Sequence, residues 1–165
     1  MKLEFGRHKR KTLEWAFFNA PWYVDWMHKN GVHMNQFHGD DLEYFRELYR
    51  RASSLTGLCS YCKKRQVTRM GLTNMSNTGM LGSVGFYCDE CEYTGGGPTE
   101  YVSPTFWTHM TWMPRCEQLM ITRAIKDRYI GWEYRLTQKR MEEFFMNDAN
   151  FLDATEGVFP QFEAV

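Results

Sequence analysis

Cys59-Ser60-Tyr61-Cys62 and Cys88-Asp89-Glu90-Cys91 decide the fold of this chain, and 25 residues lie between them. In each stretch a two-residue gap lets one tight turn direct both sulfurs at one metal ion. Two such turns complete a tetrahedral shell that has no open position for water or substrate. The spacing therefore predicts a structural zinc site formed by Cys59, Cys62, Cys88 and Cys91. The alternatives are two unrelated pairs of buried cysteines, or disulfides.

The sequence around the cysteines predicts a small β-module. Residues 66–74 and 83–87 are strand candidates, and residues 75–82 would join them. Antiparallel pairing of the two strands would bring the first cysteine pair beside the second. We therefore expect a zinc ribbon over residues 58–97. The glycines and proline of 95–98 interrupt the strand pattern and mark the expected boundary.

The segments on either side of the ribbon are predicted to be mainly helical, which gives the chain an α+β fold class. Residues 1–57 form an N-terminal helical module, with short helices that begin near Thr12, Asn19 and Asp40. Residues 98–146 contain an aromatic segment and one long helix that packs on the rest of the fold. The apolar stripe of that helix is Ile121, Ile125, Tyr129, Trp132 and Leu136. Residues 147–165 form an acidic tail, for which mobility is one expectation.

The net charge of the chain is zero, but the two halves differ in sign. Residues 1–70 carry 13 Lys and Arg against 7 Asp and Glu, and residues 71–165 carry the reverse. The candidate nucleic-acid-binding residues are Arg7, His8, Lys9, Arg10 and Lys11 in one run and Lys63, Lys64, Arg65 and Arg69 in the other. These runs indicate an anionic partner. A solvated basic face without a partner is the alternative.

Composition also bears on the compartment. The charged N-terminus and the absence of a run of roughly 18 apolar residues predict a protein that is neither secreted nor membrane-spanning. Zinc-type spacing together with the odd Cys116 predicts a reducing cytoplasm, since a secreted chain would risk mispaired cysteines. The sequence does not indicate an oligomeric state.

The stretch from Phe5 to Thr12, Phe-Gly-Arg-His-Lys-Arg-Lys-Thr, precedes a helix that contains Pro21-Trp22-Tyr23-Val24-Asp25-Trp26. Residues 5–27 resemble a small domain shared by two families. One is the exodeoxyribonuclease X-like C-terminal domain, and the other is a group of small bacterial proteins described as quorum-sensing-regulated factors. Both families have a Phe-Gly-basic-aromatic-Lys-Gly-basic-Thr turn, followed by a Pro-x-Tyr-hydrophobic-x-Trp helix.

In the nuclease family this domain is an appendage to the catalytic part. The resemblance therefore implies nucleic-acid association rather than catalysis. One position departs from the family pattern, because Arg10 stands where the family has the second glycine of the turn. Arginine adopts a positive φ less readily than glycine, but it adds a charge where phosphate contacts are expected.

Other residues were candidates for chemistry. His28, His33 and His38 recur every five residues near Asp40 and Asp41, which raises the alternative of a second metal site. Five-residue spacing argues against it, because it does not place the side chains on one face of a helix. Cys116 is either a nucleophile at the start of a helix or, as we expect, a small buried hydrophobic residue.

The leading functional hypothesis is a non-catalytic cytoplasmic zinc-ribbon protein that binds nucleic acid or a nucleic-acid-processing complex. Aromatic residues beside the basic runs could stack on unpaired bases while the cations hold phosphates. The second hypothesis is a protein-interaction factor, such as a phage-encoded inhibitor of a host or defence enzyme, that acts through aromatic and acidic surfaces. A metal-dependent nuclease is the third hypothesis.

Overall fold

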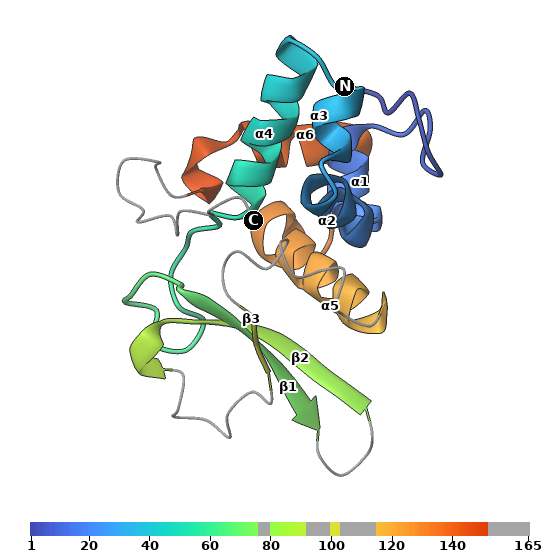
Figure 1. The fold of residues 1–165 in the computed structure, drawn as a ribbon. Helices are drawn as coiled ribbons and strands as arrows, with labels where there is room; N and C mark the ends of the chain where they lie inside the picture. The colour runs from blue at the N-terminus through green and yellow to red at the C-terminus, as the bar shows by residue number, and fades with distance from the viewer. Residues whose placement is uncertain (76–79, 92–99, 103–114, 152–165) are drawn as a thin grey trace.

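The computed structural model describes residues 1–75, 80–91, 100–102 and 115–151. Helices form one side of the molecule and a small sheet forms the other, with α5 (Arg115–Ile125) between them (Figure 1). The fold is mixed helix and strand and mostly helical, in agreement with the α+β class. The predicted boundary at 95–98, the aromatic residues 103–114 and the tail from residue 152 lie outside the described residues.

Four helices make up the N-terminal part. They are α1 (Leu13–Asn19), α2 (Pro21–Lys29), α3 (Val32–Gln36) and α4 (Asp40–Ala52). The Thr12 side chain caps α1 by accepting a hydrogen bond from the backbone N–H of Trp15, at 3.2 Å. Helix α2 begins with Pro21, whose missing N–H is not needed in a first turn. Acidic residues in the first turn of α4 and arginines in its last turn suit the helix dipole.

The sheet contains three strands in the order β2-β1-β3. The strands are β1 (Arg69–Met75), β2 (Met80–Tyr87) and β3 (Glu100–Val102). Strand β1 pairs antiparallel with both neighbours, and its register with β2 shifts between Leu72 and Asn74. Pairing of Arg69 with Tyr87 places the start of β1 beside the end of β2, where the two cysteine pairs lie.

The C-terminal helical pattern does not continue as one helix to Leu136. Helix α5 continues after Ile125 as the π-helical segment η3 (Lys126–Gly131), and the run ends at Gly131, whose φ is 111°. Trp132 and Leu136 lie beyond this end, and Trp132 is 79% exposed. A glycine at positive φ stops a helix at little cost. The chain then turns and forms the separate helix α6 (Gln138–Met146).

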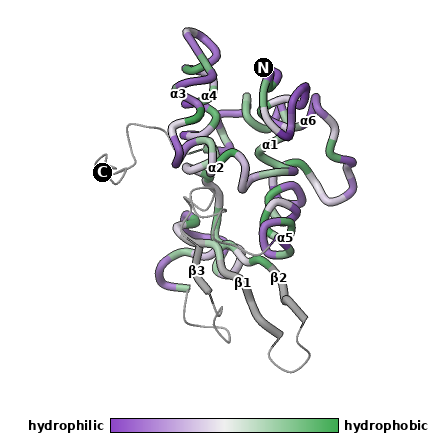
Figure 2. Tube along the Cα trace, turned by 45° about the vertical axis from the view of Figure 1, so that its right-hand side comes forward, coloured by the Kyte–Doolittle hydropathy of each residue, from purple (hydrophilic) through white to green (hydrophobic). Residues whose placement is uncertain are grey.

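One apolar core joins the helices to the base of the sheet. Leu13, Phe17 and Ile121 are fully buried in the same cluster as Met70 of β1 and Phe86 of β2. Figure 2 shows hydrophobic and hydrophilic residues alternating along α4 and α5, as expected for helices with one apolar face. The ribbon therefore rests on a core that the helices largely supply.

The first residues of the predicted acidic tail lie against α4. Residues Asp148–Asn150 form the short helix η4, and Asp148 makes an ion pair with Arg51 at 2.7 Å. Phe151 is buried and forms a β-bridge with Leu55. The described part of the tail thus folds onto the N-terminal module. No helix within the described residues is long and apolar enough to cross a membrane.

Candidate metal centre and nucleic-acid interface

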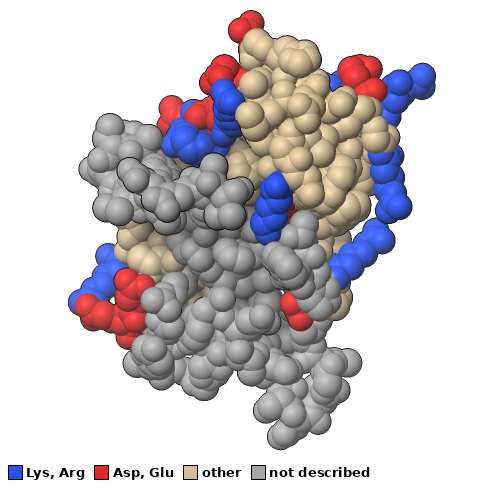
Figure 3. Space-filling model, in the orientation of Figure 1, with Lys and Arg blue, Asp and Glu red and all other residues tan. Residues whose placement is uncertain are grey.

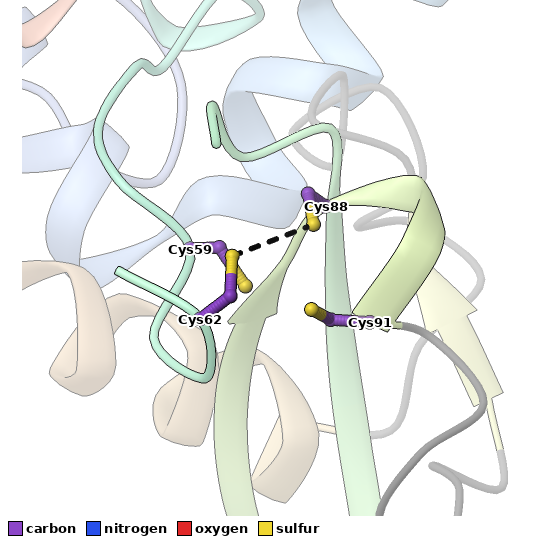
Figure 4. A group of neighbouring side chains, drawn as sticks. All are labelled: Cys59, Cys62, Cys88 and Cys91. Atoms are coloured by element: carbon purple, nitrogen blue, oxygen red, sulfur yellow. Dashed lines mark hydrogen bonds between the residues drawn. The ribbon is translucent and has the colours of Figure 1, made fainter. Parts of the chain in front are cut away.

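The four cysteines meet at one end of the sheet. A hairpin turn that is closed by a bridge between Leu58 and Gln66 supplies Cys59 and Cys62. Cys88 follows β2 directly, and Cys91 ends the short helix η1 (Asp89–Cys91). All four Sγ atoms lie within 4.8 Å of one another (Figure 4). The predicted ligand set is therefore brought together in space and could hold a metal ion.

The geometry of the sulfurs fits a tetrahedral ion. All four cysteines are free thiols, and the Sγ atoms of Cys62 and Cys88 are 3.9 Å apart, far beyond a disulfide bond. Metal–sulfur distances of about 2.3 Å imply sulfur–sulfur edges of about 3.8 Å in a tetrahedron. Cys59 and Cys88 are buried, whereas Cys62 and Cys91 are partly exposed. The cluster has a buried side and an open side.

Backbone N–H groups stabilise the thiolate form of the first pair. Hydrogen bonds from the backbone of Lys64 and Arg65 lower the pKa of Cys62 to about 6. Burial acts to raise the pKa of Cys59, but backbone N–H groups, including that of Tyr61, outweigh it and lower this pKa. In the second pair, burial and hydrogen bonds to the other cysteines raise the pKa of Cys91 to about 12. An ion would lower this pKa, since only thiolates bind it.

Backbone hydrogen bonds hold the first cysteine turn against the second. Ser60 donates its backbone N–H to the carbonyl of Phe86 in β2 at 2.8 Å. On the far side of the sheet end, the Thr68 hydroxyl donates to Asp89 at 2.7 Å. The position of each turn is thus fixed by the strand that carries the other one.

Arg128 is a structural residue of this site that the sequence did not reveal. Its guanidinium donates to the carbonyl of Leu58 at 2.5 Å and to the hydroxyl of Ser60 at 3.1 Å. The same group lies 4.5 Å from the centre of the Phe86 ring. Arg128 therefore fastens segment η3 to the first cysteine turn. In sequence it stands between Asp127 and Tyr129 in a helical pattern, and no motif marks it.

The basic residues beside the first cysteine turn differ in their surroundings. Lys63 and Lys64 are exposed, and no carboxylate oxygen of a described residue lies within 4.0 Å of either ammonium group. Arg65 is also exposed but makes an ion pair with Glu90 of the second turn. The backbone of Arg69 starts β1, and its side chain is not among those described. Two of the four predicted cations are therefore available to a ligand.

The second basic run forms a tight turn before α1. Leu3 is fully buried and exchanges backbone hydrogen bonds with Arg10 and Lys11, at 2.7 and 2.8 Å, which close the turn. The turn has positive φ at Gly6, 69°, and at Arg10, 72°. A residue other than glycine, such as Arg10, adopts this conformation at a cost of roughly 1 kcal/mol or more. The four cations Arg7, Lys9, Arg10 and Lys11 are all exposed.

His8 lies inside this turn rather than on its outer surface. Its ring centre is 5.4 Å from that of Trp15 and 5.0 Å from that of Tyr23. Burial, followed by the charges of Arg7 and Lys11, lowers the pKa of His8. The structure therefore places His8 as part of the aromatic support of the turn, whereas its neighbours face outward.

The two basic runs do not form one continuous surface. The N-terminal turn projects at the right of Figure 1, and the first cysteine turn lies at the left below α4. Figure 3 shows Lys and Arg side chains along the right-hand edge and, separately, beside acidic side chains at the lower left. A single ligand would have to extend across the molecule to reach both runs.

The other candidate residues show no catalytic arrangement among the described residues. There, the four cysteines are the one group of three or more His, Cys, Asp or Glu side chains placed to share an ion. The rings of His28 and His33 stack at 5.1 Å, and His33 is hydrogen-bonded to the carbonyl of Met27, whereas His38 is exposed. Cys116 is exposed, so the expectation of a buried residue is wrong.

Comparisons with known proteins add no family. No family model, curated protein or solved structure matches this chain.

Proposed function

We propose that this chain is a non-catalytic zinc protein that binds nucleic acid, alone or within a nucleic-acid-processing complex. The zinc ion would be bound by Cys59, Cys62, Cys88 and Cys91, whose mutual distances of at most 4.8 Å suit one tetrahedral ion. Four thiolates are a typical ligand set for structural zinc in a reducing cytoplasm. They leave no position for a substrate, so the ion would hold the ribbon together rather than catalyse a reaction.

The exposed cations of the N-terminal turn carry the proposal. Among the described residues, no carboxylate oxygen lies within 4.0 Å of the charged groups of Arg7, Lys9, Arg10 or Lys11. Four uncompensated cations on a turn closed by backbone hydrogen bonds are suited to a row of phosphates. The resemblance of residues 5–27 to an appendage of a nuclease family supports the same partner.

Binding should weaken steeply with salt. The test measures the anisotropy of fluorescein-labelled single-stranded DNA, duplex DNA and RNA with the zinc-loaded protein at about 50 and 200 mM salt. We expect at least about a tenfold loss of affinity over this range, because bound cations release counterions from the nucleic acid. Lys9→Gln/Arg10→Gln should weaken binding and flatten the salt dependence.

The matched control is Arg46→Gln/Lys139→Gln, which removes two exposed charges from α4 and α6. It should leave the affinity within about twofold of the original. Affinity that does not depend on salt, or no binding to any of the three probes, would contradict the proposed function.

A protein-interaction role is the second candidate, because large apolar side chains are exposed on residues that do not belong to the basic turns. Trp132 is 79% exposed, Met146 is 76% exposed and Tyr134 is 45% exposed. Exposed aromatic residues often anchor protein interfaces, as expected for a phage-encoded inhibitor of a host or defence enzyme. Loss of a defined partner from a pull-down with Trp132→Ala, with nucleic-acid binding unchanged, would favour this role.

A metal-dependent nuclease is the third hypothesis. Two-metal nucleases need several carboxylates that converge on two ions, and the described residues contain no such group. Incubation of labelled DNA with the purified protein and Mg²⁺ or Mn²⁺ tests it. Cleavage that is abolished by a substitution in this chain would support a nuclease and contradict the non-catalytic proposal.

A further inference from the structure

The described part of the chain contains two residues other than glycine with positive φ, and both are basic. They are Arg10, with φ 72°, and Lys63, with φ 58°. Each lies in one of the two basic turns and is exposed. A side chain in this conformation is strained, and glycine would relieve the strain. Strain of this kind is concentrated at functional positions, which makes both residues candidates for ligand contacts.

Lys63 follows the metal ligand Cys62 directly, and the turn defines its conformation. The backbone N–H of Lys63 donates to the carbonyl of Cys59 at 3.0 Å. Backbone N–H groups of the next two residues point at the sulfur of Cys62. The positive φ reverses the chain between these hydrogen bonds, so the turn itself requires the conformation but not a lysine. The lysine side chain must therefore be explained by something outside the turn.

Tyr61 is an exposed aromatic residue two positions before Lys63 in the same turn. Its backbone is fixed, because the N–H of Tyr61 donates to the sulfur of Cys59. Its ring is nevertheless 60% exposed, whereas Phe86 on β2 is 5% exposed and packs in the core. A small ribbon normally buries its aromatic rings in its core. Here the Tyr61 ring is exposed to solvent, although its backbone is held by a hydrogen bond.

Two cations follow Tyr61 in the same turn, where they would partly offset the net negative charge of a zinc ion bound by four thiolates. Lys63 and Lys64 have no carboxylate oxygen within 4.0 Å among the described residues, whereas the next cation, Arg65, is neutralised by Glu90. An exposed ring beside two available ammonium groups is the combination that holds an unpaired nucleotide, since the ring stacks on the base and the cations hold phosphates.

We infer that the first cysteine turn is a binding site for an unpaired nucleotide of a single strand, with Tyr61 stacked on the base and Lys63 on a phosphate. This inference rests on the proposed function and assigns it a strand type. A paired base in a duplex has both faces covered by its neighbours and cannot stack on Tyr61. In the N-terminal turn the half-buried rings of Trp15 and Trp22 lie against Lys11 and Arg7, so this turn contacts phosphates alone.

The experiment uses the full zinc-loaded chain, a fluorescein-labelled oligothymidylate of about 16 nucleotides and a duplex of the same length. Tyr61→Ala should weaken binding of the single strand about tenfold and leave duplex binding unchanged. Tyr61→Phe retains the ring and should restore the affinity. The original chain should bind the single strand more tightly than the duplex.

Lys63→Gly separates a structural role from a binding role. Glycine relieves the strain, so the thermal midpoint of the variant should be unchanged or higher. Its affinity for the single strand should fall about fivefold. The slope of log affinity against log salt concentration should become shallower by about one, the contribution of a single phosphate contact. A variant with higher stability and full affinity would overturn the assignment of Lys63, because it would show a lysine that only strains the turn.

Failure of the inference can be told apart from failure of the proposed function. If the original chain binds neither of these probes nor the RNA probe, both are wrong. If it binds with the expected salt dependence and is weakened by Lys9→Gln/Arg10→Gln but not by Tyr61→Ala or Lys63→Gly, only the inference is wrong. Equal affinity for the single strand and the duplex also overturns the inference alone.

Discussion

The two basic turns of this protein both present exposed cations, but different contacts hold each turn in place. Each presents exposed cations and one basic residue with positive φ, Arg10 in the N-terminal turn and Lys63 in the first cysteine turn. The N-terminal turn is supported by buried Leu3 and a cluster of rings around His8. In the first cysteine turn Cys59 is buried, but Leu58 and Tyr61 are exposed and contribute little to a core. A metal ion bound by the four cysteines would supply this support instead, so we expect the two turns to fail independently.

Loss of the metal should have the largest effect, and it should be confined to the two cysteine turns. We expect chelation, or Cys62→Ser, to unfold residues 58–66 and 88–91, because structural zinc supplies roughly 10–16 kcal/mol of folding free energy to small metal-dependent modules. Helices α1–α4 should persist, since their core includes no cysteine ligand. Hydrogen exchange resolved by segment measures both outcomes.

Cys116→Ser is the matched control for that substitution. Cys116 is exposed on α5 and is not a member of the cysteine group, so its replacement should leave metal content and exchange rates unchanged. If the N-terminal turn loses protection together with the ribbon in Cys62→Ser, the two supports are not independent.

Gly6→Ala should damage the opposite turn. Gly6 has φ 69°, and a Cβ at this position would collide with the hydroxyl of Tyr23. We expect a loss of roughly 2 kcal/mol in the free energy of unfolding, measured by urea titration, with the zinc content unchanged.

Gly31→Ala separates the collision from the backbone strain. Gly31 has φ 64°, but a Cβ there meets no atom within 4 Å. Its replacement should therefore cost only the backbone strain, roughly 1 kcal/mol. Equal losses in the two variants would show that the contact between Gly6 and Tyr23 does not support the turn.

Local signals predicted the grouping of the cysteines and the starts of the helices. Spacing alone predicted that Cys59, Cys62, Cys88 and Cys91 form one group. The position of Thr12 before an apolar periodic segment predicted the start of a helix. Gly131 was a visible interruption, but periodicity alone suggested a continuous helix to Leu136. The stop depends on a positive φ that the apolar pattern does not encode.

The tertiary contacts of the site could not be predicted from the sequence. Arg128 contacts the first cysteine turn from about 70 positions along the chain, and a lone arginine carries no sign of its partner. His8 reads as part of a basic run, yet its ring is turned into the aromatic cluster. The separation of the two basic runs likewise depends on how the helices pack. Motifs encode local geometry, whereas these features come from contacts between distant segments.

Acid should weaken the N-terminal turn, with a smaller effect than Gly6→Ala. Burial, with the charges of Arg7 and Lys11, lowers the pKa of His8 below its ordinary value of 6.5. As pH falls below 6.5 the unfolded chain takes up a proton before the folded chain does, so this contribution to stability is lost until pH passes the lowered folded pKa. His8→Phe keeps an aromatic ring in the cluster and removes the titration. The difference in urea midpoint between the original chain and this variant should therefore shift in favour of the variant from pH 7.5 to pH 5.

The pKa of His28 is lowered as well, but that residue is present in both proteins and cancels in the difference. A difference that is constant with pH would mean that the His8 ring is charged as easily in the turn as in water, and that the aromatic cluster does not enclose it.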